Sequence, residues 1–147
     1  KGEASQSADL DCLIDISVNA HIPESYVESL TLRLDVYRRI ADIRNKEDSL
    51  DVKDELKDRF GEIPESVLGL IDIALIRNCA NAMGIYEIRQ TDTNVLLFVK
   101  EIKSPKVIEL LSRLNGRAML SAGNKPYITI RCGGGSSLDM LKKVFKI

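Results

Sequence analysis

The sequence predicts an α+β fold, in which an N-terminal strand and three helices precede a strand-strand-helix-strand-strand-helix half that forms a small mixed sheet packed on helices. Three observations lead to this prediction. Apolar and polar residues alternate near the start of the chain, apolar residues recur at helical spacing between residues 30 and 83, and short β-type runs separated by turn residues follow Gly84. The chain therefore divides into a mainly helical half and a strand-rich half.

Residues 1–12 are polar and rich in small side chains, so we expect a linker or a disordered terminus there. The alternating run over residues 13–18 predicts a short strand, and Pro23 breaks regular structure shortly after it. We take residues 13–147 as a single domain.

Two amphipathic helices should follow. The first is predicted over residues 30–45 with Ser29 as its N-cap. Asp48 or Ser49 can cap the second, and Gly61 should end it, because glycine readily takes the left-handed conformation found just beyond helix C-termini.

The third helix should begin at Pro64, since proline suits the first helical turn, and end near Met83 before Gly84. Its interior is apolar on almost every face, so we expect it to be the buried central element of the fold. The apolar residues are Val67, Leu68, Leu70, Ile71, Ala74, Leu75, Ile76 and Cys79.

The second half begins with two strands joined by the polar turn 91–94, which together predict a hairpin. A helix opened by Ser104 and Pro105 and closed by Asn115-Gly116 comes next, then two more strands and a last helix capped by Ser137. The predicted strands are 85–90, 95–100, 118–121 and 127–131, and the predicted helices are 104–114 and 138–145.

Composition limits the classes of function. With 44% hydrophobic and 29% charged residues among 147, the chain has the composition of a soluble globular domain. Its apolar runs are far shorter than the roughly 20 residues of a membrane span, and it begins with no signal segment, so we expect a cytoplasmic protein. A net charge of −1 offers no general attraction to DNA or to phospholipids, and no direct DNA binding is expected.

No residue pattern indicates catalysis, a cofactor or a metal. Cys12, Cys79 and Cys132 are isolated from one another, and the single histidine, His21, cannot form a histidine-rich metal site. The Gly133–Ser137 loop could offer backbone N–H groups to a phosphate, but it lacks the P-loop lysine. A nucleotide- or phosphate-binding domain that uses this loop remains the alternative function. Three lysines near the C-terminus could contact phosphates or simply complement a helix dipole: Lys142, Lys143 and Lys146.

The second predicted helix carries an acidic face. At 100° per residue, Asp51, Asp54, Glu55 and Asp58 fall within a sector of about 100°, opposite the apolar residues Val52, Leu56 and Phe60. This face is either an ordinary solvated surface or a docking surface for a partner that presents arginines, because carboxylates accept paired hydrogen bonds from guanidinium groups. Either reading makes the helix a poor binder of DNA phosphates.

Several segments in order resemble one protein family. IPESY at 22–26, RLDVYRRIA at 33–41 and ELKDRFGEIPE at 55–65 precede a long helix that contains LIDIALIR and is followed by MGI. Together they resemble the C-terminal domain of bacterial transcription-repair coupling factors, the Mfd family. The similarity covers about residues 13–147 and is specific up to Ile85.

The resemblance implies a non-catalytic regulatory domain. In that family the parent is an ATP-dependent DNA translocase, with ATP and Mg²⁺ in its motor, which removes stalled RNA polymerase and recruits the excision repair protein UvrA. The C-terminal domain docks on the N-terminal UvrB-like module of the same chain, masks its UvrA-binding surface and keeps the protein autoinhibited. Carried over by position, the acidic contacts are Glu55 and Asp58, with Asp51 and Asp54 on the same face.

Overall fold

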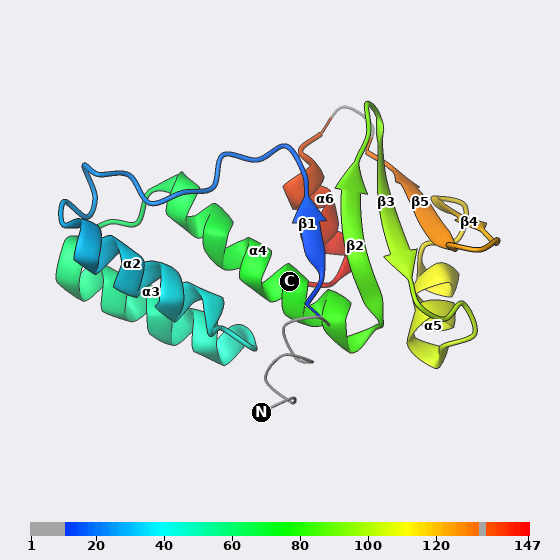
Figure 1. The fold of residues 1–147 in the computed structure, drawn as a ribbon, viewed down its shortest axis with the longest axis horizontal. Helices are drawn as coiled ribbons and strands as arrows, with labels where there is room; N and C mark the ends of the chain where they lie inside the picture. The colour runs from blue at the N-terminus through cyan, green and yellow to red at the C-terminus, as the bar shows by residue number, and fades with distance from the viewer. Residues whose placement is uncertain (1–10, 133–134) are drawn as a thin grey trace. The chain divides into compact units, whose positions relative to one another are not determined.

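The computed structural model describes residues 11–132 and 135–147. Their contacts divide them into two compact units. The helical unit comprises Val18–Ile76 together with Ile147, and the sheet unit comprises residues 11–17 and 77–146. The two units are described separately, with the described residues coloured along the chain in Figure 1. Most of the predicted loop at Gly133–Ser137 is described, but Gly133 and Gly134 lie outside the described residues, as does most of the predicted linker.

The helical unit contains α2 (Leu30–Ala41), α3 (Lys46–Phe60) and the first part of α4 (Glu65–Ala82). Its core is a single apolar cluster that takes residues from all three helices and from the segment before α2. The prediction that α4 is a central buried element is confirmed in part, because Val67, Ile71 and Ile76 are fully buried whereas Leu70 lies at the edge of the cluster.

The sheet unit contains β1 (Leu13–Asp15), β2 (Ile85–Gln90), β3 (Asn94–Val99), β4 (Ala118–Ser121) and β5 (Tyr127–Arg131), with α5 (Pro105–Arg113) and α6 (Ser137–Val144). The strand order is β1-β2-β3-β5-β4, with β1 parallel to β2 and every other pair antiparallel. The predicted α+β class with a small mixed sheet is therefore confirmed.

Burial alternates along the central strands, so the two faces of the sheet differ. Ile88, Leu97 and Ile128 point to a fully buried face, which α5 and α6 cover from behind the strands in Figure 1. No described helix of the sheet unit covers the opposite face, whose side chains Tyr86, Phe98 and Tyr127 are half-buried, and we call it the open face. No helix among the described residues is long and apolar enough to cross a membrane.

Most element boundaries lie within one residue of the predicted ones, as at α4, β3 and α5, and larger differences occur at β1, α2 and the start of α3. The first strand stops at Asp15 instead of continuing to Val18, and α2 ends at Ala41 instead of near Asn45. Asn45 is free to cap α3 for that reason, which replaces the predicted caps Asp48 and Ser49. Ser136 rather than Ser137 caps α6, because the Ser137 hydroxyl donates a hydrogen bond to Gln90 instead.

Candidate functional site

Local chemistry fixes both ends of α3, the acidic helix. The Asn45 side chain accepts a hydrogen bond from the Asp48 backbone N–H at 2.8 Å, and the Asp48 carboxylate accepts one from the backbone N–H of Arg44 at 3.0 Å. The first bond satisfies an N–H group of the first helical turn, and the second fixes the residue before the cap. At the other end Gly61 adopts the expected positive φ of 90°, and Lys57 and Arg59 lie in the last turn, where positive charge complements the helix dipole.

The inner face of α3 is held by apolar burial and by one tyrosine. Val52 and Leu56 are each 2% exposed within the core of the helical unit. The Tyr26 hydroxyl donates to the Gly61 carbonyl at 2.9 Å and lies 3.3 Å from the Leu56 carbonyl, while its ring packs 5.7 Å from that of Phe60. Burial, followed by the charge of Glu62, raises the pKa of Tyr26. The helix therefore cannot rotate, and its opposite face must point outward.

Three of the four predicted site residues lie on that outward face. Asp51, Asp54 and Asp58 are exposed, and in the part of the chain that the structure describes none of them forms an ion pair or a side-chain hydrogen bond. Glu47, one turn before Asp51, extends the row and is also exposed. These four residues, spaced by three or four along the helix, form what we call the acidic stripe.

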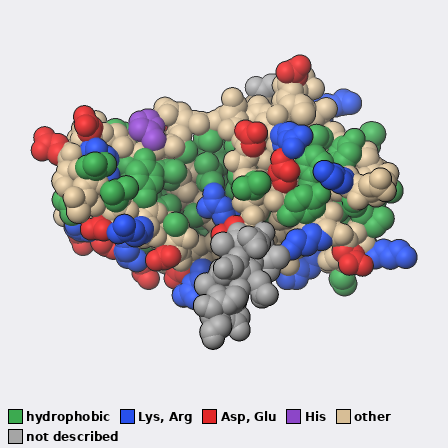
Figure 2. Space-filling view, viewed as in Figure 1, with side chains coloured by type: hydrophobic (Ala, Val, Ile, Leu, Met, Phe, Trp, Pro, Cys, Tyr) green, Lys and Arg blue, Asp and Glu red, His purple; other side chains and the backbone are tan. Residues whose placement is uncertain are grey.

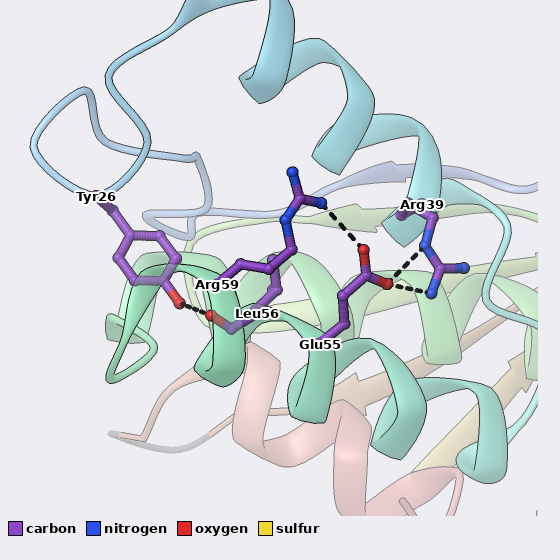
Figure 3. A network of polar contacts seen from close by, with 5 residues as sticks. All are labelled: Tyr26, Arg39, Glu55, Leu56 and Arg59. Carbon is purple, nitrogen blue, oxygen red and sulfur yellow. Dashed lines mark hydrogen bonds and ion pairs between the residues drawn. The ribbon is translucent and has the colours of Figure 1, made fainter.

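Glu55, the fourth predicted residue, has a different environment. Its carboxylate accepts hydrogen bonds from Arg39 of α2, with Nε at 3.0 Å, and from Arg59 on its own helix, with Nη1 at 3.1 Å (Figure 3). The hydrogen bond from Arg39 is the main reason that the pKa of Glu55 lies below its usual value, and the same bond raises the pKa of Arg39. Glu55 thus joins α2 to α3 inside the helical unit.

Sequence reasoning missed both Arg39 and Tyr26. Arg39 could have been found by comparing helix faces, because the buried Val36 and Ile40 fix which side of α2 faces α3. Tyr26 offered no comparable signal, since its hydrogen bond reaches a carbonyl 35 positions away across a loop.

Apolar residues are exposed in the same unit. Leu30, Leu34 and Tyr37 recur at helical spacing on α2 with exposed fractions of 63%, 47% and 36%, and Leu50 of α3 is 52% exposed. Protein interfaces combine apolar contacts with a polar rim, and the helical unit offers both kinds of surface.

No alternative chemistry is assembled among the described residues. They contain no group of three or more side chains that could hold a metal ion, and His21 is exposed. The three cysteines are free thiols. In the described part of the glycine-rich loop both hydroxyls already have partners, because Ser136 caps the Asp139 N–H and Ser137 binds Gln90. The Ser137 hydroxyl donates in this arrangement, and the Ser136 oxygen accepts.

Comparisons with known proteins agree on one family. Residues 16–109 match the model of the TRCF domain. The chain is 28% identical over 150 residues to the transcription-repair-coupling factor of Bacillus subtilis, covering 98% of this chain and 13% of that protein. It is 30% identical over 114 residues to the factor of Rickettsia prowazekii, covering 76% of this chain and 10% of that one. The chain thus spans only about an eighth of these relatives or less.

A solved structure has the same fold. The crystal structure of the C-terminal domain of a transcription-repair coupling factor superposes with a TM-score of 0.78 at 18% sequence identity, over 92% of this chain and 88% of that one.

Proposed function

The chain belongs to the TRCF domain family, and from this premise we propose that it is a non-catalytic regulatory domain of a DNA-translocating transcription-repair coupling factor. It docks on the UvrB-like N-terminal module of the same parent chain and masks the UvrA-binding surface. UvrA and RNA polymerase are then indirect partners. ATP and Mg²⁺ serve the motor of the parent, this domain needs no cofactor, and the protein acts in the cytoplasm.

The observation that carries the proposal is the acidic stripe on α3. Asp51, Asp54 and Asp58 are exposed and form no ion pair or side-chain hydrogen bond among the described residues, whereas arginines on the same helix and the preceding one bind Glu55. A row of unpaired carboxylates on a rigid helix can accept guanidinium groups without first breaking bonds of its own. A partner surface that carries arginines fits this arrangement.

Glu55 has a supporting part in this proposal. Because Arg39 and Arg59 already occupy its carboxylate, it positions α3 and sets the orientation of the stripe, while Asp51, Asp54 and Asp58 make the contacts. The exposed leucines of α2 supply apolar area beside these contacts.

The test is charge reversal in the full-length parent. The triple variant Asp51→Arg, Asp54→Arg and Asp58→Arg should keep its fold, because these side chains are exposed and form no ion pair or side-chain hydrogen bond among the described residues. Docking should weaken by about 2–5 kcal/mol, the usual loss when one side of a desolvated charge pair is removed, and UvrA binding should rise in the absence of RNA polymerase. UvrA affinity is measured by titration, and circular dichroism of the domain checks the fold.

The matched control reverses three exposed acids of the sheet unit, Asp92, Glu101 and Glu109, and so changes the net charge equally. It should leave UvrA affinity at the wild-type value. If the triple variant and the wild type bind UvrA equally, the acidic stripe is only a solvated surface. ATP turnover by the purified domain would contradict its non-catalytic role.

A further inference from the structure

The open face of the sheet unit carries a row of aromatic rings. In the register of the sheet, Phe98 of β3 lies between Glu87 of β2 and Tyr127 of β5. The ring of Phe98 is 5.4 Å from that of Tyr127 and 6.2 Å from that of Tyr86, which occupies an irregular position in β2. Three rings on three adjacent strands therefore form a half-buried platform.

Further apolar side chains continue this face along the strands. The next row of the sheet places Leu96 beside Thr129, and Thr129 beside Met119, which is 70% exposed. Arg89 lies over the Phe98 ring at 5.2 Å and is held by Glu87. Figure 2, which views this face, shows hydrophobic side chains with basic and acidic ones beside them.

A hollow of about 560 Å³ opens on β3, β4 and β5, bordered by Arg117 and Arg131. Met119 and Thr129 also line it, so the hollow adjoins the apolar row. Both arginines are exposed, and within the described residues neither guanidinium has a hydrogen bond or an ion pair. Two unpaired guanidinium groups at one hollow are suited to bind a phosphate group.

The charge of the sheet unit favours an anionic partner. Residues 11–17 and 77–146 contain 12 lysines and arginines against 7 acids, whereas residues 18–76 contain 8 against 13. The net charge of −1 for the whole chain therefore hides a basic sheet unit. The net charge of the whole chain is therefore no argument against a nucleic-acid partner for this unit.

We propose that the open face of the sheet unit binds single-stranded nucleic acid. Unpaired bases stack on Tyr86 and Tyr127, on either side of the Phe98 ring that Arg89 covers, and Arg117 and Arg131 hold the phosphates. Aromatic rings on adjacent strands bind bases in this way because every base has a π-face, whereas the bases of a duplex are stacked on one another and out of reach. Duplex DNA therefore binds more weakly than a single strand.

The first experiment measures fluorescence anisotropy of labelled 12-nucleotide DNA, RNA of the same sequence and the corresponding duplex, each titrated with the 147-residue chain. One or both single strands should bind with a Kd of about 10⁻⁴–10⁻⁶ M, and the duplex roughly tenfold more weakly. The DNA and RNA arms show which sugar is preferred. No binding of either single strand, or duplex binding as tight, would overturn the proposal.

The second experiment separates this face from general electrostatics. Arg117→Glu with Arg131→Glu should weaken single-strand binding about tenfold or more and flatten its salt dependence. Lys106→Glu with Lys143→Glu is the matched control, since both lysines are exposed on helices that cover the other face of the sheet. An equal loss in the control would mean that binding is not located on the open face.

The third experiment tests stacking. The chain contains four tyrosines and no tryptophan, so Tyr86 and Tyr127 contribute to its fluorescence together with Tyr26 and Tyr37 of the helical unit. A bound single strand should quench part of this emission, and Tyr127→Leu should reduce both the quenching and the affinity, the latter about fivefold or more. Tyr86→Leu provides a second variant if Tyr127→Leu unfolds. If a folded leucine variant binds the single strand with unchanged affinity, the aromatic platform does not bind bases. If the chain binds no oligonucleotide but self-associates, and the leucine variant loses that self-association, the face is a protein contact.

Discussion

The two units of this chain have opposite charge and different surface chemistry. The helical unit is acidic, and its exposed polar features are carboxylates on α3 beside exposed leucines on α2. The sheet unit is basic, and its open face combines aromatic rings with arginines. A helix displays one stripe of side chains in a line, whereas a sheet displays a flat array, so the two surfaces suit partners of different shape.

This contrast explains how one small domain of nearly zero net charge can offer two charged surfaces. Acids dominate residues 18–76 and bases dominate residues 77–146, so each unit creates a local field of its own sign. Fields between exposed charges are screened beyond about 8–10 Å at ordinary ionic strength, and each surface acts on its own neighbourhood. Charge should therefore be counted for each unit and not for the whole chain.

The largest expected loss of stability comes from a substitution in the apolar core of the helical unit. It tests whether this unit is stabilised more by its core than by its charges. Leu75→Ala should lower the free energy of unfolding by about 2–5 kcal/mol, because it removes apolar burial and leaves a cavity in the core cluster. Leu50→Ala is the control, as this side chain is 52% exposed and its loss should cost about 0.5 kcal/mol or less. Chemical denaturation followed by circular dichroism measures both, and equal losses would mean that Leu75 is not a core residue.

Most of the fold could be predicted from the sequence because the local sequence signals agreed with the tertiary structure. Gly61 and Gly84 take positive φ where the sequence predicted helix ends, and β4 and β5 have the predicted limits. Two of the errors concern helix caps. Ser137 donates to Gln90, 47 positions away, which no local pattern contains. Asp48 takes part in the cap of α3 through local bonds with Asn45 and Arg44 instead of being the cap itself.

The candidate site could be predicted only in part from the sequence. Helical periodicity located the four acids on one side of α3, but it could not show that Glu55 binds Arg39, which lies 16 positions away on another helix. The aromatic platform was invisible to sequence reasoning for a similar reason. Tyr86, Phe98 and Tyr127 are far apart in sequence, and only the strand order β2-β3-β5 brings them together.

A smaller effect compares equivalent helix caps in the two units. Asn45→Ala should destabilise the chain by about 1 kcal/mol, because it removes a 2.8 Å hydrogen bond at the start of the 15-residue α3. Ser136→Ala removes a longer bond of 3.3 Å at the start of the 8-residue α6 and should cost less. Thermal unfolding of both variants measures the difference. A larger loss of stability for Ser136→Ala would show that the cap in the sheet unit contributes more to stability than the cap of α3.

The smallest expected loss of stability comes from removing an ion pair, and this loss is recognised by its dependence on pH. Glu55→Gln removes the charge that joins α2 to α3 and should cost less than about 1 kcal/mol at pH 7, because its carboxylate and both arginines are partly exposed to solvent. The folded state lowers the pKa of Glu55, so the carboxylate contributes stability above its unfolded pKa of about 4.3. That contribution disappears as the pH falls through the lower pKa of the folded state.

The difference in unfolding free energy between wild type and Glu55→Gln should therefore be constant from about pH 6 to pH 8 and shrink below pH 4. Glu87→Gln is the matched control in the sheet unit, since the one ion pair of Glu87 among the described residues is with Arg89, two residues away on the same strand. It should cost less, because its ion pair connects no separate elements of structure. If the two variants lose equal stability at pH 7, the pairing of Glu55 with Arg39 does not hold α2 against α3, and the orientation of the acidic stripe must depend on the apolar core alone.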